Sequence, residues 1–363
     1  MGKLLPKKIS TALSPFLSVL SKPQVKHFLL YLVGLIWLIK FHSTREIATQ
    51  FAKALPDNLQ RFLNGSPKKR QRLQEANQNQ IASVANRHRE EVLAIIDDTT
   101  CAREGKKIQG IGVHHSADGL VKGQCAVTCI LKFGVQCFAW AVAGYQPKSC
   151  CGDGAFKSKI DLALEILTSL QDQLRTSVCV LIDSWYACAP VLNPIIEAGW
   201  RFVAALKSNR ILEIGGKKII VGHLAKGPRT YKTVKLSKKR KLKVAKKFVW
   251  LPKVGRVLLF ITKGGAKEVR FLITNDLDMT EVQMVELYRE RFGIEIFHKD
   301  IKQHLAFGHM FMRSWQGVQT HWTLVAVAYN LIALSAPSSC KGFRQKIRHF
   351  RNQLSHPHLL NAL

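Results

Sequence analysis

Three acidic positions in this sequence end apolar segments or lie within a helical one, where an unpaired carboxylate is costly. Asp97 and Asp98 follow one apolar run, Asp183 follows a second, and Glu295 lies in a helical pattern. Three carboxylates that met at one place would repel each other unless a cation lay between them. Oxygen-only ligands are typical of Mg²⁺, and two such ions can activate water and stabilise a leaving oxygen. These residue types therefore indicate a metal site for phosphodiester cleavage.

Other polar residues surround the third acid at helical spacing. Arg291, Glu295 and Lys302 lie 3, 7 and 14 positions after Tyr288, so at about 100° per residue all four share one helix face. Glu290 points away from that face and is expected to be exposed. An acid flanked by Tyr, Arg and Lys suits a metal ligand with phosphate-binding side chains on either side. An exposed helix with ordinary Arg–Glu pairs is the alternative interpretation.

The net charge indicates a polyanionic partner. The chain has 363 residues with 55 Lys and Arg against 24 acids, which gives +31 at pH 7, and such an excess favours nucleic acid or an anionic membrane surface. The longest apolar run, residues 28–39, is shorter than the roughly 20 residues that cross a bilayer. The N-terminus lacks the pattern of a secretory signal. We therefore expect a cytoplasmic protein that binds nucleic acid and no membrane.

Changes of pattern along the chain predict a mixed α/β fold in five segments. A helical domain precedes a core in which strands and helices alternate, and a basic, β-rich insertion interrupts that core. The expected segments are the helical domain 1–90, the first part of the core 91–209, the insertion 210–270, the second part of the core 271–335 and a basic tail 336–363.

Local signals predict where elements begin and end. Ser43 with Glu46 opens a helix in the N-terminal segment, and Asp278 with Glu281 opens the long helix that carries the polar face. The polar run 97–100 is expected to end the first apolar strand. The N-terminal helices are rich in Lys and Arg, which is typical of a helix-turn-helix DNA-contacting module and equally of a solvated bundle.

Positive charge is concentrated in the insertion. Residues 210–256 hold sixteen Lys or Arg and a single acid. Short β-branched stretches predict twisted strands there. The run Lys238-Lys239-Arg240-Lys241 fits contact with DNA phosphates, although it would also pass as a nuclear localisation signal.

The polar helix face resembles a known family signature. The pattern Tyr-x2-Arg-x3-Glu-x6-Lys from Tyr288 to Lys302 is similar, at every spacing, to the Tyr-Arg-Glu-Lys signature of bacterial insertion-sequence DDE transposases. These enzymes form part of a cut-and-paste superfamily with a ribonuclease H-like catalytic core. The segments that end in Asp97 and Asp183 resemble the strands that carry the family's two catalytic aspartates. The resemblance spans roughly residues 90–335.

The resemblance implies a ribonuclease H-like mixed sheet flanked by helices, and a DNA transposase that cleaves transposon ends and joins them to target DNA. Asp97, Asp183 and Glu295 would bind two Mg²⁺ ions, for which Mn²⁺ can substitute. Double-stranded DNA would be the partner, as transposon end and as target, and the protein would be a homodimer when bound to it in the bacterial cytoplasm or nucleoid. The residues that would grip phosphates of the transposon end are Tyr288, Arg291 and Lys302.

Several assignments stay open at this point. The family's Asp-x-Thr pattern fits Asp97 and also Asp98, and adjacent strand residues point to opposite faces; Asp97 is preferred because it directly follows the apolar run. Trp250 in the insertion can hold a base flipped out beside the cleaved end, as in relatives, or simply pack on its strand. A Mg²⁺-dependent nuclease or resolvase on the same core, or a decayed copy that only binds DNA, are the alternative functions.

Overall fold

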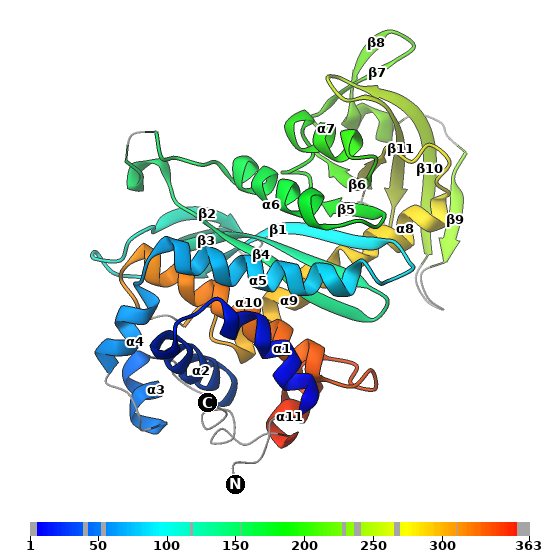
Figure 1. Ribbon diagram of the computed structural model, residues 1–363. Coiled ribbons are helices and arrows are strands. Elements are labelled where there is room, and N and C mark those ends of the chain that lie inside the picture. The colour runs from blue at the N-terminus through cyan, green and yellow to red at the C-terminus, as the bar shows by residue number, and fades with distance from the viewer. Residues whose placement is uncertain are drawn as a thin grey trace. The chain divides into compact units, whose positions relative to one another are not determined.

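The computed structural model divides into two compact units (Figure 1). The first consists of residues 1–89, 98–162 and 295–363, and the second of residues 90–97 and 163–294. The structure describes residues 6–38, 43–51, 56–116, 119–152, 154–226, 230–235, 241–264, 269–309 and 311–353. Among these residues, no helix has both the length and the apolar character needed to cross a bilayer.

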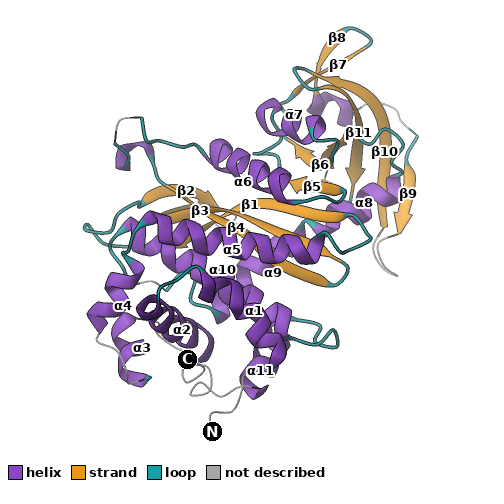
Figure 2. Ribbon diagram, in the orientation of Figure 1, coloured by secondary structure: helices purple, strands orange, loops and turns teal. Residues whose placement is uncertain are grey.

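Helices make up most of the first unit, together with an antiparallel group of strands (Figure 2). Helix α10 is its centre, because nearly all of its side chains are buried and it packs against β4, α1 and α5. The strands are the end of β1 (Val92–Ala102), β2 (Gly112–Ser116), β3 (Gly119–Phe133) and β4 (Gln136–Tyr145), in which β3 lies next to all the others. The helices are α1 (Lys7–Ser18), α2 (Lys22–Trp37), α3 (Thr44–Gln50), α4 (Pro56–Leu63), α5 (Pro67–Ala85), most of α9 (Phe292–His304), α10 (Trp315–Ser335), α11 (Phe343–Gln353) and the short 3₁₀ helix η1 (Lys148–Cys150).

The second unit is built on a mixed sheet. The start of β1 pairs in parallel with β5 (Val178–Ile182), which pairs in parallel with β6 (Arg201–Leu206). From β6 the order continues through antiparallel neighbours: β12 (Val269–Thr274), β11 (Gly255–Lys263), β10 (Lys241–Leu251), β7 (Ile211–Ile214) and β8 (Lys217–Ile220), with β9 (Lys232–Lys235) also on β10. Its helices are most of α6 (Lys159–Gln173), α7 (Ala189–Glu197), the 3₁₀ helix η2 (Val221–Ala225) and α8 (Glu281–Glu290). The predicted mixed α/β fold with a β-rich insertion is confirmed.

The grouping into compact units differs from the predicted segments. The N-terminal helices share the first unit with β2, β3 and β4, and the basic insertion shares the second unit with β5 and β6. The predicted basic tail contains the packed helix α11, whose buried residues Phe343, Ile347 and Phe350 follow a helical period.

The first strand is longer than predicted. The run 97–100 does not end it, because β1 continues to Ala102. Two polar side chains within the strand have charged partners: Arg291 contacts Asp97, and Lys159 contacts Asp98. Pairing removes most of the cost of keeping these carboxylates inside the sheet, so the strand can pass through them.

The predicted long helix is two helices, α8 and α9, which meet at Arg291. Helix α8 begins with Thr280 as its N-cap, in a capping box with Gln283, rather than with Asp278. At its end the Arg291 N–H donates to the Tyr288 carbonyl oxygen (3.2 Å), a tighter turn than that of an α-helix. The prediction of a single uninterrupted helical face is therefore wrong, since the face argument requires constant rotation per residue.

A buried amide network joins β4 to two helices. The Asn330 side chain on α10 accepts a hydrogen bond from the Ala139 N–H (2.8 Å) and donates to the Ala139 carbonyl oxygen (2.8 Å). It also donates to Asn77 Oδ1 on α5 (2.8 Å), and Asn77 donates to the same Ala139 carbonyl oxygen (3.1 Å). Both asparagines are buried. Helix α10 thus satisfies main-chain groups of β4 that would otherwise need a further strand.

We expect Asn330→Leu to lower the free energy of unfolding by about 2–4 kcal/mol, because it leaves buried main-chain and amide groups without partners. The matched control is Asn79→Leu, at an exposed position of α5, which should change that free energy by no more than about 0.5 kcal/mol. Urea unfolding of both variants, followed by circular dichroism, measures the difference. Equal midpoints would contradict the role assigned to the network.

Candidate active site

Asp97 and Asp183 occupy adjacent positions on two parallel strands of the second unit. Ile96 of β1 is paired in register with Ile182 of β5, and each aspartate directly follows. Neighbouring strands lie about 4.8 Å apart, so the two carboxylates emerge from one edge of the sheet. Both residues are half-buried. The carboxyl ends of parallel strands are where open α/β sheets bind ligands.

Asp97 is paired with Arg291, one of the four residues of the Tyr-Arg-Glu-Lys pattern (Tyr288, Arg291, Glu295 and Lys302), which we call the tetrad. Arg291 Nη1 donates to Asp97 Oδ2 at 2.9 Å, with side chains that are 12% and 19% exposed. The guanidinium also lies 5.9 Å from the ring centre of Tyr288 and 5.5 Å from that of Phe292. Limited access of water strengthens a charge-assisted hydrogen bond of this kind. The first aspartate is therefore held by the residue that the sequence predicted as a phosphate contact.

Asp183 is held by the loop that follows it. Its Oδ1 accepts hydrogen bonds from the main-chain N–H groups of Trp185 (2.9 Å) and Tyr186 (3.3 Å). Burial raises the pKa of Tyr288, and the negative charge of Asp183 contributes to the rise. Tyr288 therefore keeps its proton at neutral pH and can act as a hydrogen-bond donor.

Asp98 has different partners from those of Asp97. Lys159 Nζ donates to Asp98 Oδ2 at 2.6 Å, and the Cys125 thiol donates to the same oxygen at 3.5 Å. Successive strand residues point to opposite faces of a sheet, and the separate partners agree with that alternation. Of the two open candidates, Asp97 is the one that contacts the tetrad.

The remaining tetrad residues lie on α9, in the first unit. Glu295 is in the first turn of the helix and is exposed. Lys302 Nζ donates to the main-chain oxygen of Thr100 at 3.0 Å. Glu290, expected to be exposed, is half-buried at the end of α8.

Trp250 presents its ring on the surface of the insertion. It is 51% exposed on β10, where it is paired in register with Arg256 of β11 and with Glu213 of β7. Phe248, two residues earlier on the same face, is 48% exposed, and the Arg256 guanidinium lies 4.5 Å from its ring centre. Aromatic rings between basic side chains are typical of surfaces that stack with bases. Both rings are accessible for contact with another molecule.

The basic run of the insertion is described in part. Lys241 is exposed at the start of β10, opposite Lys235 of β9. Lys238, Lys239 and Arg240 lie outside the described residues. The described lysines of residues 210–256, including Lys246, are exposed. Exposure is the condition for contact with a polyanion.

The donor chemistry of the aspartate pair suits a divalent cation. Within the described ranges, no three His, Cys, Asp or Glu side chains are gathered so as to hold a metal ion, so the predicted triad of Asp97, Asp183 and Glu295 stays a prediction. Two adjacent carboxylates nevertheless provide the oxygen ligands that Mg²⁺ prefers. Arg291 supplies positive charge to Asp97 in the arrangement described.

Sequence reasoning missed two features of this region. The pairing of Arg291 with Asp97 joins residues 194 positions apart, and no local pattern indicates it. No local pattern indicates the pairing of Lys159 with Asp98 either. The available signal was the apolar run that leads directly into Asp97 and Asp98. Acids next to a buried strand need cationic partners, so this run indicated that such partners exist.

Comparisons with known proteins agree on one class. Residues 155–331 match the family model described as "Transposase DDE domain", a range that contains Asp183 and Glu295 and begins after Asp97. A search of the curated proteins finds no match. The fold is similar to that of the piggyBac transposase in the cryo-EM structure of its synaptic complex with hairpin DNA, with a TM-score of 0.53 at 13% identity, covering 94% of this chain and 72% of the other. Residues 155–331 thus match a transposase DDE domain, in a chain whose fold is similar to that of a known transposase.

Proposed function

We propose that the protein is a DNA transposase of a bacterial insertion sequence, which cleaves the transposon ends and joins them to target DNA. The observation that supports this most is the adjacent placement of Asp97 and Asp183, with Arg291 of the tetrad bonded to Asp97. The match of residues 155–331 to a transposase DDE domain supports the same class of enzyme.

In this proposal Asp97, Asp183 and Glu295 hold two Mg²⁺ ions. Bound there, the metal would supply charge stabilisation for an attacking and a leaving oxygen in phosphodiester cleavage. In this proposal Arg291 leaves Asp97 when that carboxylate takes up a metal ion, and the released guanidinium suits a DNA phosphate in bidentate contact. Tyr288, protonated at neutral pH, donates a hydrogen bond to the DNA strand that Arg291 contacts.

The DNA partner is held by surfaces beyond the acids. Lys302 would bind a phosphate of the transposon end, and the basic insertion, from Lys238 to Lys241, would follow the backbone. Trp250, exposed on β10, would hold a base flipped out beside the cleaved end. The DNA is double-stranded as transposon end and target, and the protein acts as a homodimer on it in the cytoplasm.

We expect Asp97→Asn, Asp183→Ala and Glu295→Ala each to abolish Mg²⁺-dependent nicking of supercoiled plasmid, because each removes a metal ligand. EDTA should have the same effect on the wild type. The matched control is Asp98→Asn, which removes the neighbouring acid bonded to Lys159 and should keep nicking. Fluorescence anisotropy should show that all four variants bind DNA, and nicking by Asp183→Ala would contradict the assignment.

We further expect Arg291→Gln to lower the Mg²⁺ concentration for half-maximal nicking and to slow the maximal rate. Arg291 competes with the cation for Asp97 and then contacts DNA. Its loss therefore favours Mg²⁺ binding but weakens the contact with DNA. Lys302→Gln is the control, because Lys302 donates to a main-chain oxygen; it should slow nicking without lowering the Mg²⁺ requirement. An unchanged requirement in Arg291→Gln would refute the competition.

A strand-transfer assay separates this proposal from its alternatives. The wild type is supplied with a precleaved duplex end and a target plasmid in Mg²⁺. A transposase joins the 3′ hydroxyl of the end to the target, whereas a nuclease or resolvase cleaves DNA and never joins it. DNA binding with neither cleavage nor joining would instead identify a decayed copy.

A further inference from the structure

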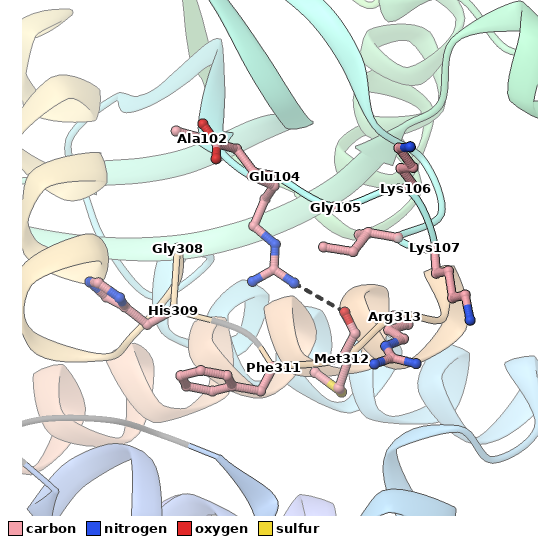
Figure 3. A pocket seen from close by; sticks show the side chains of 12 residues that line it. Ala102, Glu104, Gly105, Lys106, Lys107, Gly308, His309, Phe311, Met312 and Arg313 are labelled. Carbon is pink, nitrogen blue, oxygen red and sulfur yellow. Dashed lines mark hydrogen bonds between the residues drawn. The ribbon is translucent and has the colours of Figure 1, made fainter.

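A pocket of about 630 Å³ lies in the first unit (Figure 3). One wall is the connection after β1, residues 102–108, and the other is the connection after α9, at residues 308–309 and 311–313. A volume of this size is enough for a ligand as large as a nucleotide.

Hydrogen bonds fix the two walls against each other. Arg103 Nη2 donates to the Met312 carbonyl oxygen at 3.1 Å, the bond drawn in Figure 3. The Gln109 N–H donates to the Arg313 carbonyl oxygen at 2.9 Å, and the Trp315 N–H donates to Gln109 Oε1 at 2.8 Å. Because each of these bonds holds a main-chain group of one wall, the shape of the pocket exists before any ligand binds, which lowers the entropic cost of binding.

Most of the charged side chains that line the pocket are cations. Arg103, Lys106 and Lys107 come from one wall and Arg313 from the other, against the single acid Glu104. The structure describes no ion pair for Lys106, Lys107 or Arg313, and all three are exposed. Arg103 Nε is buried and, among described atoms, has no hydrogen-bond partner. A half-buried guanidinium in this state is stabilised by an anion.

The cations of the pocket continue from the tetrad. Lys302 donates to the Thr100 carbonyl oxygen, two residues before the pocket begins. Burial raises the pKa of Cys101 to about 11, and the positive charges of Lys302 and Arg103 both act against that rise. Lys302 is bonded to Thr100, and Arg103 lies three residues later on the same segment, so both cations are close to Cys101.

We propose that this pocket binds backbone phosphates of the DNA strand that passes Lys302. The inference rests on the proposed action of the protein on DNA. Several cations spread over an open pocket suit successive phosphates better than one free ion. Phe311, 61% exposed at the same wall, offers an apolar surface to a deoxyribose.

The test compares Lys106→Ala/Lys107→Ala with Lys7→Ala/Lys8→Ala. Both doubles remove an adjacent pair of exposed lysines from the first unit, and neither changes a residue assigned to catalysis. Anisotropy with a labelled duplex, in EDTA and at several salt concentrations, measures affinity. For the pocket double, Lys106→Ala/Lys107→Ala, we expect duplex affinity roughly 10- to 30-fold weaker near physiological salt. The slope of log affinity against log salt concentration should fall by an amount equivalent to about one to two phosphate contacts.

The outcomes separate the possible ligands and functions. Equal losses in the two doubles would overturn the proposal, since they would reflect net charge alone. Binding of inorganic phosphate that the pocket double abolishes, with duplex affinity unchanged, would overturn it in favour of a free anion. Because binding is measured in EDTA, a selective loss of duplex affinity supports the pocket even if the wild type fails to nick DNA, which would count against the proposed function only.

Discussion

Two carboxylates that directly follow the paired residues of neighbouring parallel strands repel each other unless they are neutralised, and this constraint shapes the candidate site. Asp97 and Asp183 directly follow residues that are paired in register, and two like charges about 5 Å apart repel by roughly 3 kcal/mol at an effective dielectric constant near 20. Arg291 supplies the opposite charge to Asp97, and main-chain N–H groups stabilise Asp183. The fold can therefore keep both carboxylates next to each other when no metal is bound.

The turn at Arg291 follows from the same constraint. In one straight helix this residue would share a face with Glu295 and Lys302. In the structure it lies between α8 and α9, where its side chain contacts Asp97. Because the contact of Arg291 with Asp97 is made by side chains alone, Arg291 can change its partner by rotation of its side chain, without breaking main-chain hydrogen bonds of either helix. This gives a physical basis for exchange between an aspartate and a DNA phosphate.

Much of the fold could be predicted because its strands are buried on both faces. The apolar run Val178–Ile182 predicts β5 at its observed bounds, since such strands need no alternation. The end of β1 could not be predicted, because its continuation through Asp97 depends on Arg291, far away in sequence. Helix α11 was predictable in principle, but the basic residues between its buried Phe343, Ile347 and Phe350 concealed the period. The candidate acids Asp97 and Asp183 could be proposed from their position after apolar runs, while their partners required the three-dimensional structure.

The central claim is that Asp97 and Asp183 together bind a divalent cation. Isothermal titration of Mn²⁺ into the DNA-free protein tests it most directly, with the wild type, Asp97→Asn, Asp183→Asn and Asp98→Asn compared under one buffer. We predict saturable Mn²⁺ binding by the wild type and by Asp98→Asn, and loss of that binding in Asp97→Asn and Asp183→Asn. Equal binding by all four proteins would contradict it.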